Sequence, residues 1–147
     1  MIRHAGNPRE ARAAIGGVIA VMNTDLPTYA GKLDAFVASL KDAVNTQHAA
    51  GWDLDGNAGV DLFTGTDAGD LGVAALTPSQ VASAGLVRDP DTGALVQGGR
   101  LDNTNAIDLA GALDGVASGY RELITGFGVT VSAAKRAVEN QSVIVAQ

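Results

Sequence analysis

Residues 15–40 read IGGVIAVMNTDLPTYAGKLDAFVASL, and their apolar side chains recur at alternating steps of four and three. The members of this stripe are Ile15, Ile19, Met22, Leu26, Tyr29, Leu33, Phe36 and Leu40. Such heptad spacing places all eight side chains on one side of an α-helix, and Val18, Val37 and Val44 widen the stripe. We therefore expect one helix over about residues 10–50, roughly 58 Å long from Glu10 to His48, with Gly51 ending it. The stripe is expected to form a core, and in an assembly subunit part of it would serve a neighbouring chain.

Pro27 lies inside this helical pattern and has no backbone N–H to donate. A proline at such a position kinks or interrupts a helix. The sequence predicts this interruption near Thr24 and Asp25, with Asp25 capping the segment that follows.

Residues 51–101 are rich in glycine and turn-forming residues. We expect a tight reversal within 51–61, a short strand over 71–76, and a short helix that Thr77 and Pro78 open and that extends to about residue 84. A small hairpin is expected from Leu86–Val87 and residues 94–96, joined by a turn at residues 90–93.

The last third of the chain returns to a helical pattern. Residues 102–105 supply several capping side chains for a helix that carries Ile107, Leu109 and Leu113. Asp114 and Gly115 are expected to break it, and a final helix to begin near Ser118 and continue toward Gln147, where the lack of a stop signal suggests truncation.

These elements predict one mainly α-helical domain over residues 1–147, with helices at about 10–50 and 102–147 and a loop with short β and helical pieces at 51–101. Two long amphipathic helices at opposite ends of a chain most simply pack antiparallel in an elongated bundle. The glycine-rich middle segment, with its short strands or hairpin, would then sit at one end of the pair.

Composition excludes several classes of function. The net charge of −6 and the scattered lysines and arginines argue against nucleic-acid binding, which needs clustered basic residues. The absence of cysteine excludes a disulfide framework, a zinc-thiolate site and a cysteine nucleophile. No apolar run is long enough to span a membrane, and no secretory signal opens the chain. Neither a nucleophile elbow nor a phosphate-binding loop occurs, so we expect no catalysis and no cofactor.

One segment resembles a calcium-binding loop. Placing Asp53 at position 1 of such a loop puts Asp55, Asn57 and Asp61 at positions 3, 5 and 9, where hard oxygen ligands belong. However, Ala58 occupies the position that needs glycine, and Thr64 the position that needs glutamate. The pattern therefore favours a turn capped by its own aspartate over a metal site.

The two histidines and the single tryptophan have simple structural interpretations. His4 is expected to be inert, and His48 to cap carbonyls at the end of the long helix. Trp52, directly after the helix end, is expected to fold back and close the core there, with an anchor for a partner as the alternative.

Two parts of the chain resemble the family of flagellar hook-associated protein 1. The first combines Leu26-Pro27-x-Tyr29 with Asn45-x-x-His48-x-x-Gly51 and the following Asp53-Leu54-Asp55-Gly56, then Leu62-Phe63. The second is the run from Asp102 to Ala106, which is similar to an Asp-Asn-x-Asn-Ala segment of that family. Ile15 to Ile19 are similar to its glycine-rich helix start, whereas Asn23 replaces the arginine that is usual there.

The resemblance implies a structural role in the bacterial flagellum, outside the cell, where hook and filament join. Its partners would be hook protein, the second junction protein and copies of itself. The chain would be part of the outer helical domain, without the terminal assembly helices or the signal for export through the flagellar secretion apparatus. This implies a monomeric fragment.

Two other classes stay open. A different axial protein, such as flagellin or the second junction protein, would share the long helices but not the Asn-x-x-His-x-x-Gly segment. A calcium-stabilised extracellular adhesion module would use the loop at Asp53.

Overall fold

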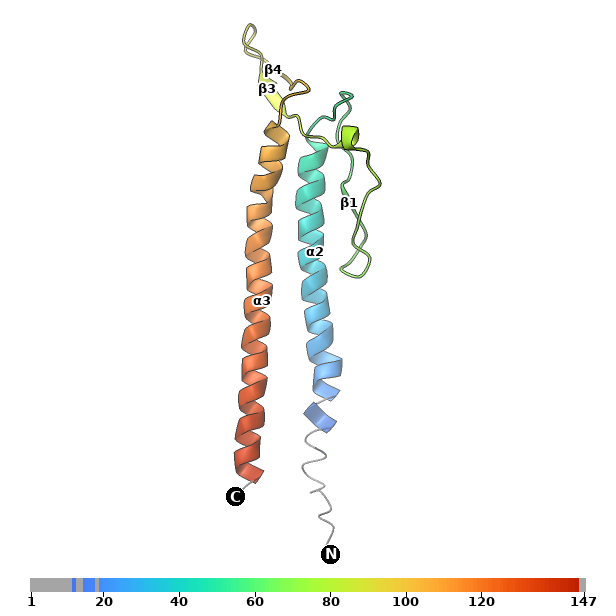
Figure 1. The fold of residues 1–147 in the computed structure, drawn as a ribbon. Helices are drawn as coiled ribbons and strands as arrows, with labels where there is room; N and C mark the ends of the chain where they lie inside the picture. Colours follow the sequence, from blue (N-terminus) through green and yellow to red (C-terminus); the bar gives the residue numbers. More distant parts are fainter. Residues whose placement is uncertain (1–11, 13–14, 18, 146–147) are drawn as a thin grey trace, which may run out of the picture.

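The computed structural model describes residues 12, 15–17 and 19–145. Its main feature is a pair of long helices, α2 (Leu26–Ala49) and α3 (Thr104–Val145), which lie side by side and antiparallel (Figure 1). The chain is mainly helical and elongated, as the sequence predicts. The start expected at Glu10, together with His4 and Val18, lies outside the described residues.

A π-helical turn, η1 (Val21–Asp25), precedes α2 and confirms the interruption expected near Thr24 and Asp25. Pro27 has no N–H for the carbonyl four residues earlier, and the Leu26 N–H bonds instead to the carbonyl of Val21, five residues back. The capping role expected of Asp25 is wrong, because Asp25 has helical backbone angles and its side chain makes no cap hydrogen bond.

α3 is continuous over 42 residues, so the break expected at Asp114 and Gly115 and the new helix at Ser118 are wrong. Each interior glycine costs a helix about 1 kcal/mol. A row of small and apolar residues nevertheless continues at helical spacing through the expected break: Ala112, Val116, Gly119 and Leu123. Packing of this row against α2 favours the uninterrupted helix.

The middle segment holds two small antiparallel pairs. Strand β1 (Phe63–Thr64) pairs with β2 (Gly72–Val73), and β3 (Leu86–Arg88) pairs with β4 (Leu95–Gln97), Val87 opposite Val96. The second pair confirms the predicted hairpin, whose turn contains Gly93 at φ 70°. β2 lies within the expected strand, while β1 was not predicted.

The helix expected over residues 77–84 is shorter than predicted. A 3₁₀ turn, η2 (Pro78–Gln80), is closed by a capping box in which Thr77 and Gln80 satisfy each other's backbone groups. After Val81 the backbone becomes extended, because Ala84 pairs with Trp52 instead of continuing the helix.

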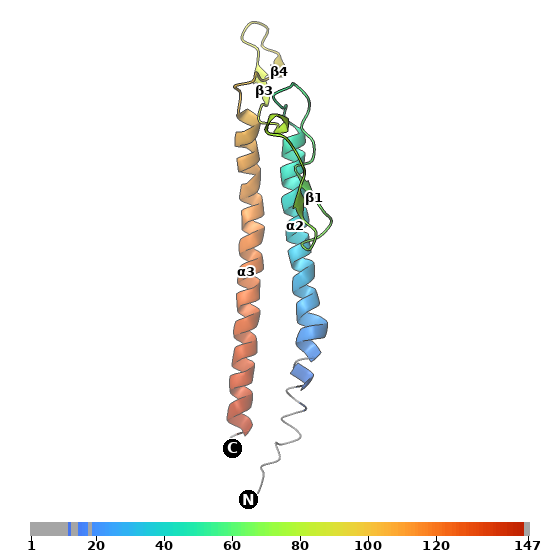
Figure 2. The same cartoon turned by 45° about the vertical axis from the view of Figure 1, so that its right-hand side comes forward.

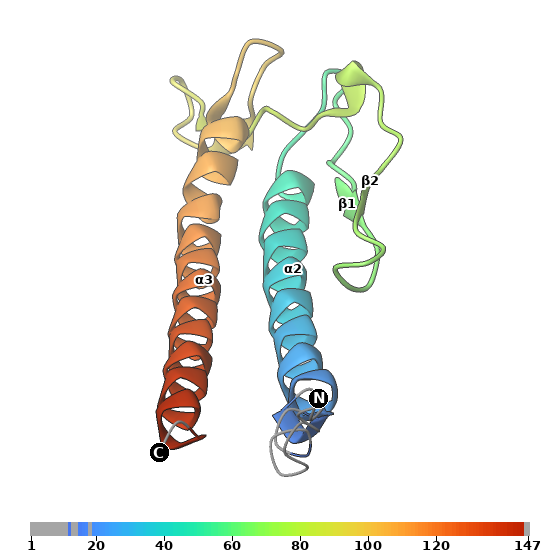
Figure 3. The ribbon, with the colours of Figure 1, turned by 60° about the horizontal axis from the view of Figure 1, so that its bottom comes forward.

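The middle segment does not lie wholly at the end of the helix pair, as expected. β3 and β4 project beyond it, but residues 61–73 return along the side of α2 away from α3 (Figures 1 and 3). Three side chains of α2 fasten this stretch: Lys41 Nζ donates to the Gly65 carbonyl at 2.7 Å, Asn45 bonds to Leu62 and Phe63, and Asp34 accepts the Ala68 N–H.

The apolar stripe of the first helix is not a closed core. Val37 and Val44 are buried, and Tyr29 and Phe36 contact Phe127 and Tyr120 of α3 with ring centroids 5.1 and 5.7 Å apart. By contrast, five members of the stripe stay exposed: Ile15, Ile19, Met22, Leu26 and Leu33. The expected core is thus formed by only part of the stripe, and the rest is exposed in the isolated chain.

Candidate functional site: a buried polar junction at the helix ends

The most completely buried side chains are polar. His48, near the end of α2, is 0% exposed, and Asn105, at the start of α3, is 2% exposed. Figure 2 shows these two helix ends together with the middle segment. Asn45 and His48, three positions apart on α2, share one side of the helix, and Gln47 points to α3. We call these four residues, together with Gly51, Gly59 and Asp102, the polar junction.

His48 joins two loops that are far apart in the sequence. Its Nδ1 is 2.5 Å from the carbonyl oxygen of Val60, and its Nε2 is 2.9 Å from the backbone nitrogen of Ala82. Because the Ala82 N–H donates to Nε2, that nitrogen carries no proton and Nδ1 is the donor to Val60. The role expected for His48, capping the carbonyls of its own helix, is therefore wrong.

Asn45 holds the chain just before β1. Its Oδ1 accepts the N–H groups of Leu62 at 3.0 Å and Phe63 at 2.8 Å, and its Nδ2 donates to the Phe63 carbonyl at 2.9 Å. The amide thus pairs with backbone as a neighbouring strand would. One side chain thereby fixes the path of residues 61–73 along α2.

Asn105 ties the start of α3 to α2 and to the middle segment. Its Oδ1 accepts a hydrogen bond of 2.8 Å from Gln47 Nε2, and its Nδ2 donates to the Ala82 carbonyl at 2.7 Å. Ala82 is therefore held on both sides, by His48 through its N–H and by Asn105 through its carbonyl.

Asp102 fixes the chain just ahead of α3. Its Oδ2 accepts hydrogen bonds from the Gly85 N–H at 2.7 Å and the Thr104 hydroxyl at 2.8 Å. Asp102 Oδ1 also accepts the N–H of Thr104, the first residue of α3, at 3.4 Å, which confirms a capping role among residues 102–105. Asp102 also fixes the chain just before β3 through Gly85.

Two glycines permit the close packing of the junction. A Cβ at Gly51 would lie 2.1 Å from Asn105 Nδ2, and one at Gly59 would lie 2.0 Å from the carbonyl oxygen of His48. Neither glycine has a positive φ, so the requirement is for space and not for backbone conformation. Gly51 thus ends the helix as predicted, and Asn105 adds a reason that helix patterns do not contain.

Trp52 fastens the middle segment through its backbone. Its N–H donates to the Ala84 carbonyl at 2.8 Å, and its own carbonyl accepts the Ala84 N–H at 3.2 Å. The side chain is half-buried. The expected folding of this side chain over the helix end stays a prediction, as does its alternative role as an anchor for a partner.

The hydrogen bonds of the polar junction hold distant segments of the chain together. Among the described residues, no buried side-chain nitrogen or oxygen lacks a hydrogen-bond partner. The side chains of Asn45, His48 and Asn105 are each engaged by backbone groups of other segments or by another amide. The arrangement holds four chain segments in one geometry: the end of α2, residues 60–63, residues 82–85 and the start of α3.

The calcium-loop candidates form a hydrogen-bonded turn. Asp53 Oδ1 accepts the backbone N–H groups of Asp55 at 2.9 Å and Asn57 at 2.8 Å, and Gly56 has φ 82°. This confirms the self-capped turn expected at Asp53. Within the part of the chain that the structure describes, no three His, Cys, Asp or Glu side chains gather as metal ligands, and Asp53, Asp55 and Asp61 are among those described.

We expect calcium to leave the stability unchanged. Asp53 Oδ1 is engaged by two backbone N–H groups, and Asp53, Asp55 and Asp61 do not come together as a set of metal ligands. Thermal unfolding followed by circular dichroism, with excess calcium and with chelator, should give the same Tm. A Tm that rises with calcium concentration would show a ligand bound to the folded state and contradict this expectation.

Four aspartates have a pKa below the ordinary value of 3.8: Asp53, Asp70, Asp89 and Asp102. The main cause is the same in each, since backbone N–H groups donate to the ionised carboxylate: Asn57 to Asp53, Asp67 to Asp70, Thr92 to Asp89 and Gly85 to Asp102. Each aspartate closes a turn or anchors an element end, so the charged form is bound into the fold.

The depressed pKa values predict acid lability. A carboxyl whose pKa is lower in the folded state stabilises the fold above pH 3.8, and this contribution disappears as the pH falls through the folded pKa. We expect the free energy of unfolding, from urea titrations, to be level above about pH 5 and to drop below about pH 4. Asp102→Asn should make that drop smaller, whereas Asp55→Asn, at an exposed side chain, should leave it unchanged. An Asp102→Asn profile as steep as that of the unmodified chain would contradict the assignment.

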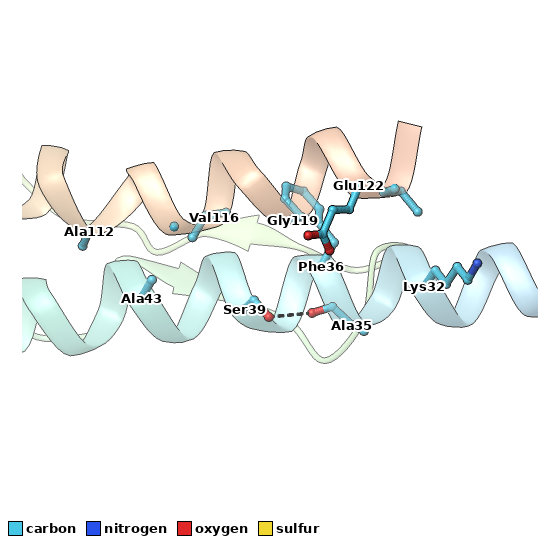
Figure 4. A pocket seen from close by; sticks show the side chains of 11 residues that line it. Lys32, Ala35, Phe36, Ser39, Ala43, Ala112, Val116, Gly119 and Glu122 are labelled. Carbon is cyan, nitrogen blue, oxygen red and sulfur yellow. Dashed lines mark hydrogen bonds between the residues drawn. The ribbon is translucent and has the colours of Figure 1, made fainter. Parts of the chain in front are cut away.

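A groove of about 630 Å³ runs between α2 and α3 (Figure 4). Small residues line much of it, including Ala35 and Ala43 of α2 and Ala112 and Gly119 of α3, and Lys32 and Glu122 lie toward one end. Its walls are the facing surfaces of the antiparallel helices α2 and α3, and Lys32 and Glu122 are the charged residues among those that line it.

The sequence singled out part of the polar junction without its geometry. Asn45, His48 and Gly51 were singled out as a family-like segment, and Asn105 as part of another, but nothing linked the two. Asn45 and His48 lie on the side of α2 that also carries the buried Val44. Polar residues on an apolar side of a helix were the sequence feature that could have indicated a buried polar site.

Comparison with known proteins gives one match. Residues 4–63 match the family model of the flagellar hook-associated protein FlgK helical domain. No curated protein and no solved structure matches the chain significantly. The match includes Asn45, His48, Gly51 and Gly59 of the polar junction and supports the resemblance seen in the sequence. Over the described residues, no helix is long and apolar enough to cross a membrane.

Proposed function

We propose, from the match at residues 4–63, that this chain is a structural part of a flagellar hook-associated protein and acts where hook and filament join. The family match supports a structural role in the bacterial flagellum. The Asn-x-x-His-x-x-Gly segment and the fold built around it support a place at the hook–filament junction.

The observation that carries the proposal is what the segment does. Asn45, His48 and Gly51 have no free chemical group to offer a substrate and instead lock the two helices and the middle segment together. A part that transmits force between two tubes needs such a fixed geometry at the end of a rod. The same residues therefore link the family match to a mechanical role and to the absence of catalysis.

The partners follow from this location. We infer contacts with hook protein on one side and with the second junction protein on the other, and lateral contacts with further copies in a helical array. Such arrays are built from heterologous contacts that do not close on themselves. The exposed apolar members of the first helix, Met22, Leu26 and Leu33, are suited to contacts of this kind. The location is extracellular, after export through the flagellar secretion apparatus.

Electron microscopy of the source bacterium tests the proposal. Deletion of the parent gene should leave hooks without filaments and release filament protein into the medium. Immunogold labelling with an antibody against residues 51–101 should mark the boundary between hook and filament in the unmodified strain. Normal filaments after deletion, or gold along the whole filament, would overturn the junction role; the second result would instead support another axial protein.

A further inference from the structure

The link between β4 and α3 contains a basic residue that belongs to neither a helix nor a strand. Arg100 lies in the turn at residues 99–102 with an exposed side chain, and the following Leu101 is 100% exposed. One hydrogen bond of 2.8 Å, from the Asp102 N–H to the Gly99 carbonyl, closes this turn. The peptide bond between Arg100 and Leu101 is thus at the centre of an exposed turn.

The turn is fastened at both sides to Gly85, which lies just before β3. The Gly98 N–H donates to the Gly85 carbonyl at 2.7 Å, and the Gly85 N–H donates to Asp102 Oδ2 at 2.7 Å. We call these two hydrogen bonds the Gly85 clamp. Only residues 99–101 lie between them, and a Cβ at Gly99 would meet nothing within 4 Å. The turn is therefore open to solvent while its two ends are fixed.

Serine proteases of the trypsin class cleave after lysine or arginine and bind the chain in an extended form. Exposed turns with small residues open to this form readily, whereas a helix or a paired strand must first lose its own hydrogen bonds. Among the described residues from 15 to 145, Arg100 is the basic residue outside such elements. The others lie in α2, β3 or α3: Lys32, Lys41, Arg88, Arg121, Lys135 and Arg136. The geometry thus singles out Arg100 for cleavage.

Cleavage at this position changes little beyond the bond itself. Hydrolysis adds one water molecule, so that Arg100 gains a carboxylate and Leu101 gains an amino group. Because both residues are exposed, the new charges stay in water and no charge has to be buried. The hydrogen bond between Gly85 and Asp102 lies outside the cleaved bond and still joins the two products.

Further contacts between the two products lie at the start of α3. Asn105, on the second product, accepts a hydrogen bond from Gln47 at 2.8 Å and donates to the Ala82 carbonyl at 2.7 Å. The Ala106 N–H donates to the Ser83 carbonyl at 3.2 Å. These bonds hold the start of α3 against the first product without the link.

Aromatic contacts join the products along the helix pair. Tyr29 meets Phe127 and Phe36 meets Tyr120, with ring centroids 5.1 and 5.7 Å apart. The Tyr29 hydroxyl also donates to the Gly126 carbonyl at 3.3 Å. The contacts between the two products therefore extend from the polar junction along α2 and α3.

From these observations we propose that a trypsin-class serine protease cleaves the chain between Arg100 and Leu101, and that residues 1–100 and 101–147 stay associated afterwards. The cleaved chain is then a two-part molecule, held together by the Gly85 clamp, the polar junction and the aromatic contacts. The proposal rests on the chain's own contacts and does not depend on the flagellar assignment.

Limited digestion of the full chain by trypsin, followed by mass spectrometry of the fragments, tests the cleavage site. The fragment that begins at Leu101 should appear before any fragment cut after Arg88 or Arg121. Arg100→Gln should remove this fragment, whereas Lys32→Gln, at a basic residue of α2, should leave it unchanged. Earlier cleavage after Arg88 or Arg121 would contradict the assignment.

Asp102→Ala tests the Gly85 clamp. The change removes the hydrogen bond that holds the turn on its α3 side, so the turn is open more often and cleavage after Arg100 should accelerate about threefold or more. Cleavage after Arg121, which requires α3 to open, should keep its rate. Asp91→Ala, at an exposed aspartate of the neighbouring hairpin, is the matched control and should change neither rate. Unchanged cleavage after Arg100 in Asp102→Ala would show that the clamp does not hold the turn.

Size-exclusion chromatography of the cleaved chain tests whether the products stay together. In native buffer at micromolar concentration, both fragments should elute in one peak at the volume of the uncleaved chain. In concentrated urea they should separate, because no covalent bond then joins them. Separate peaks in native buffer would overturn the proposed association, since the contacts across the cleaved bond would not hold α3 in place.

Discussion

His48→Ala should destabilise the chain by about 3–5 kcal/mol, since it removes a fully buried ring and both of its hydrogen bonds. The Ala82 N–H and the Val60 carbonyl would lose their partners, and a buried backbone group without one is costly. The midpoint of urea unfolding, followed by circular dichroism at 222 nm, measures the effect. Two segments that are distant in the sequence lose their link to α2 at once, so the midpoint should fall sharply.

Thr46→Ala is the matched control. Thr46 lies in the same turn of α2 with an exposed side chain, and its backbone carbonyl still accepts the Ala50 N–H in the variant. Its free energy of unfolding should stay within about 0.5 kcal/mol of that of the unmodified chain. If His48→Ala proves no more destabilising than Thr46→Ala, the imidazole does not hold the loops.

Gly59→Ala is the second change with a large expected effect. Its Cβ would lie 2.0 Å from the carbonyl oxygen of His48 and 2.8 Å from the carbonyl carbon. Both contacts are with backbone at the end of α2, which cannot move aside without disturbing the helix end. We expect a loss of about 3 kcal/mol or more in the free energy of unfolding.

Gly111→Ala is the control for that experiment and should have the opposite sign. Gly111 is inside α3, and a Cβ there would meet nothing within 4 Å. The change removes the entropic cost of a helical glycine and should stabilise by about 0.5–1 kcal/mol. A Gly59→Ala variant as stable as the Gly111→Ala variant would show that the close approach at residue 59 is not maintained in solution.

The long elements were predictable because their information is local and repeated. The four-and-three spacing from Ile15 to Leu40 specified a helix, and Pro27 specified where its hydrogen bonding changes. The turn at Asp53 and the hairpin around Gly93 followed from residues that tolerate or favour particular backbone angles.

The elements that were missed depend on contacts between distant residues. Asp114 and Gly115 are locally poor for a helix, yet α3 continues through them because its apolar row packs on α2. The pairing of β1 with β2 depends on Asn45, which fixes Phe63 from 18 positions away. No local pattern contains that information.

The candidate site was only partly visible in the sequence for the same reason. His48 looked like a helix-terminal residue, because its partners Val60 and Ala82 lie 12 and 34 positions away. The need for Gly51 was visible as a helix stop, but its contact with Asn105 was not. The sequence also could not show that much of the first stripe stays exposed, since core and interface residues have the same composition.

Amide hydrogen exchange by NMR tests the central claim, that the polar junction fixes the middle segment to both helices. The account predicts that the amides of Leu62, Phe63 and Ala82, which donate to Asn45 and His48, are the slowest to exchange between residues 51 and 101. They should exchange far more slowly than those of the exposed β4. Exchange of these three amides as fast as that of β4 would contradict the account, because the loops would then not be locked to α2.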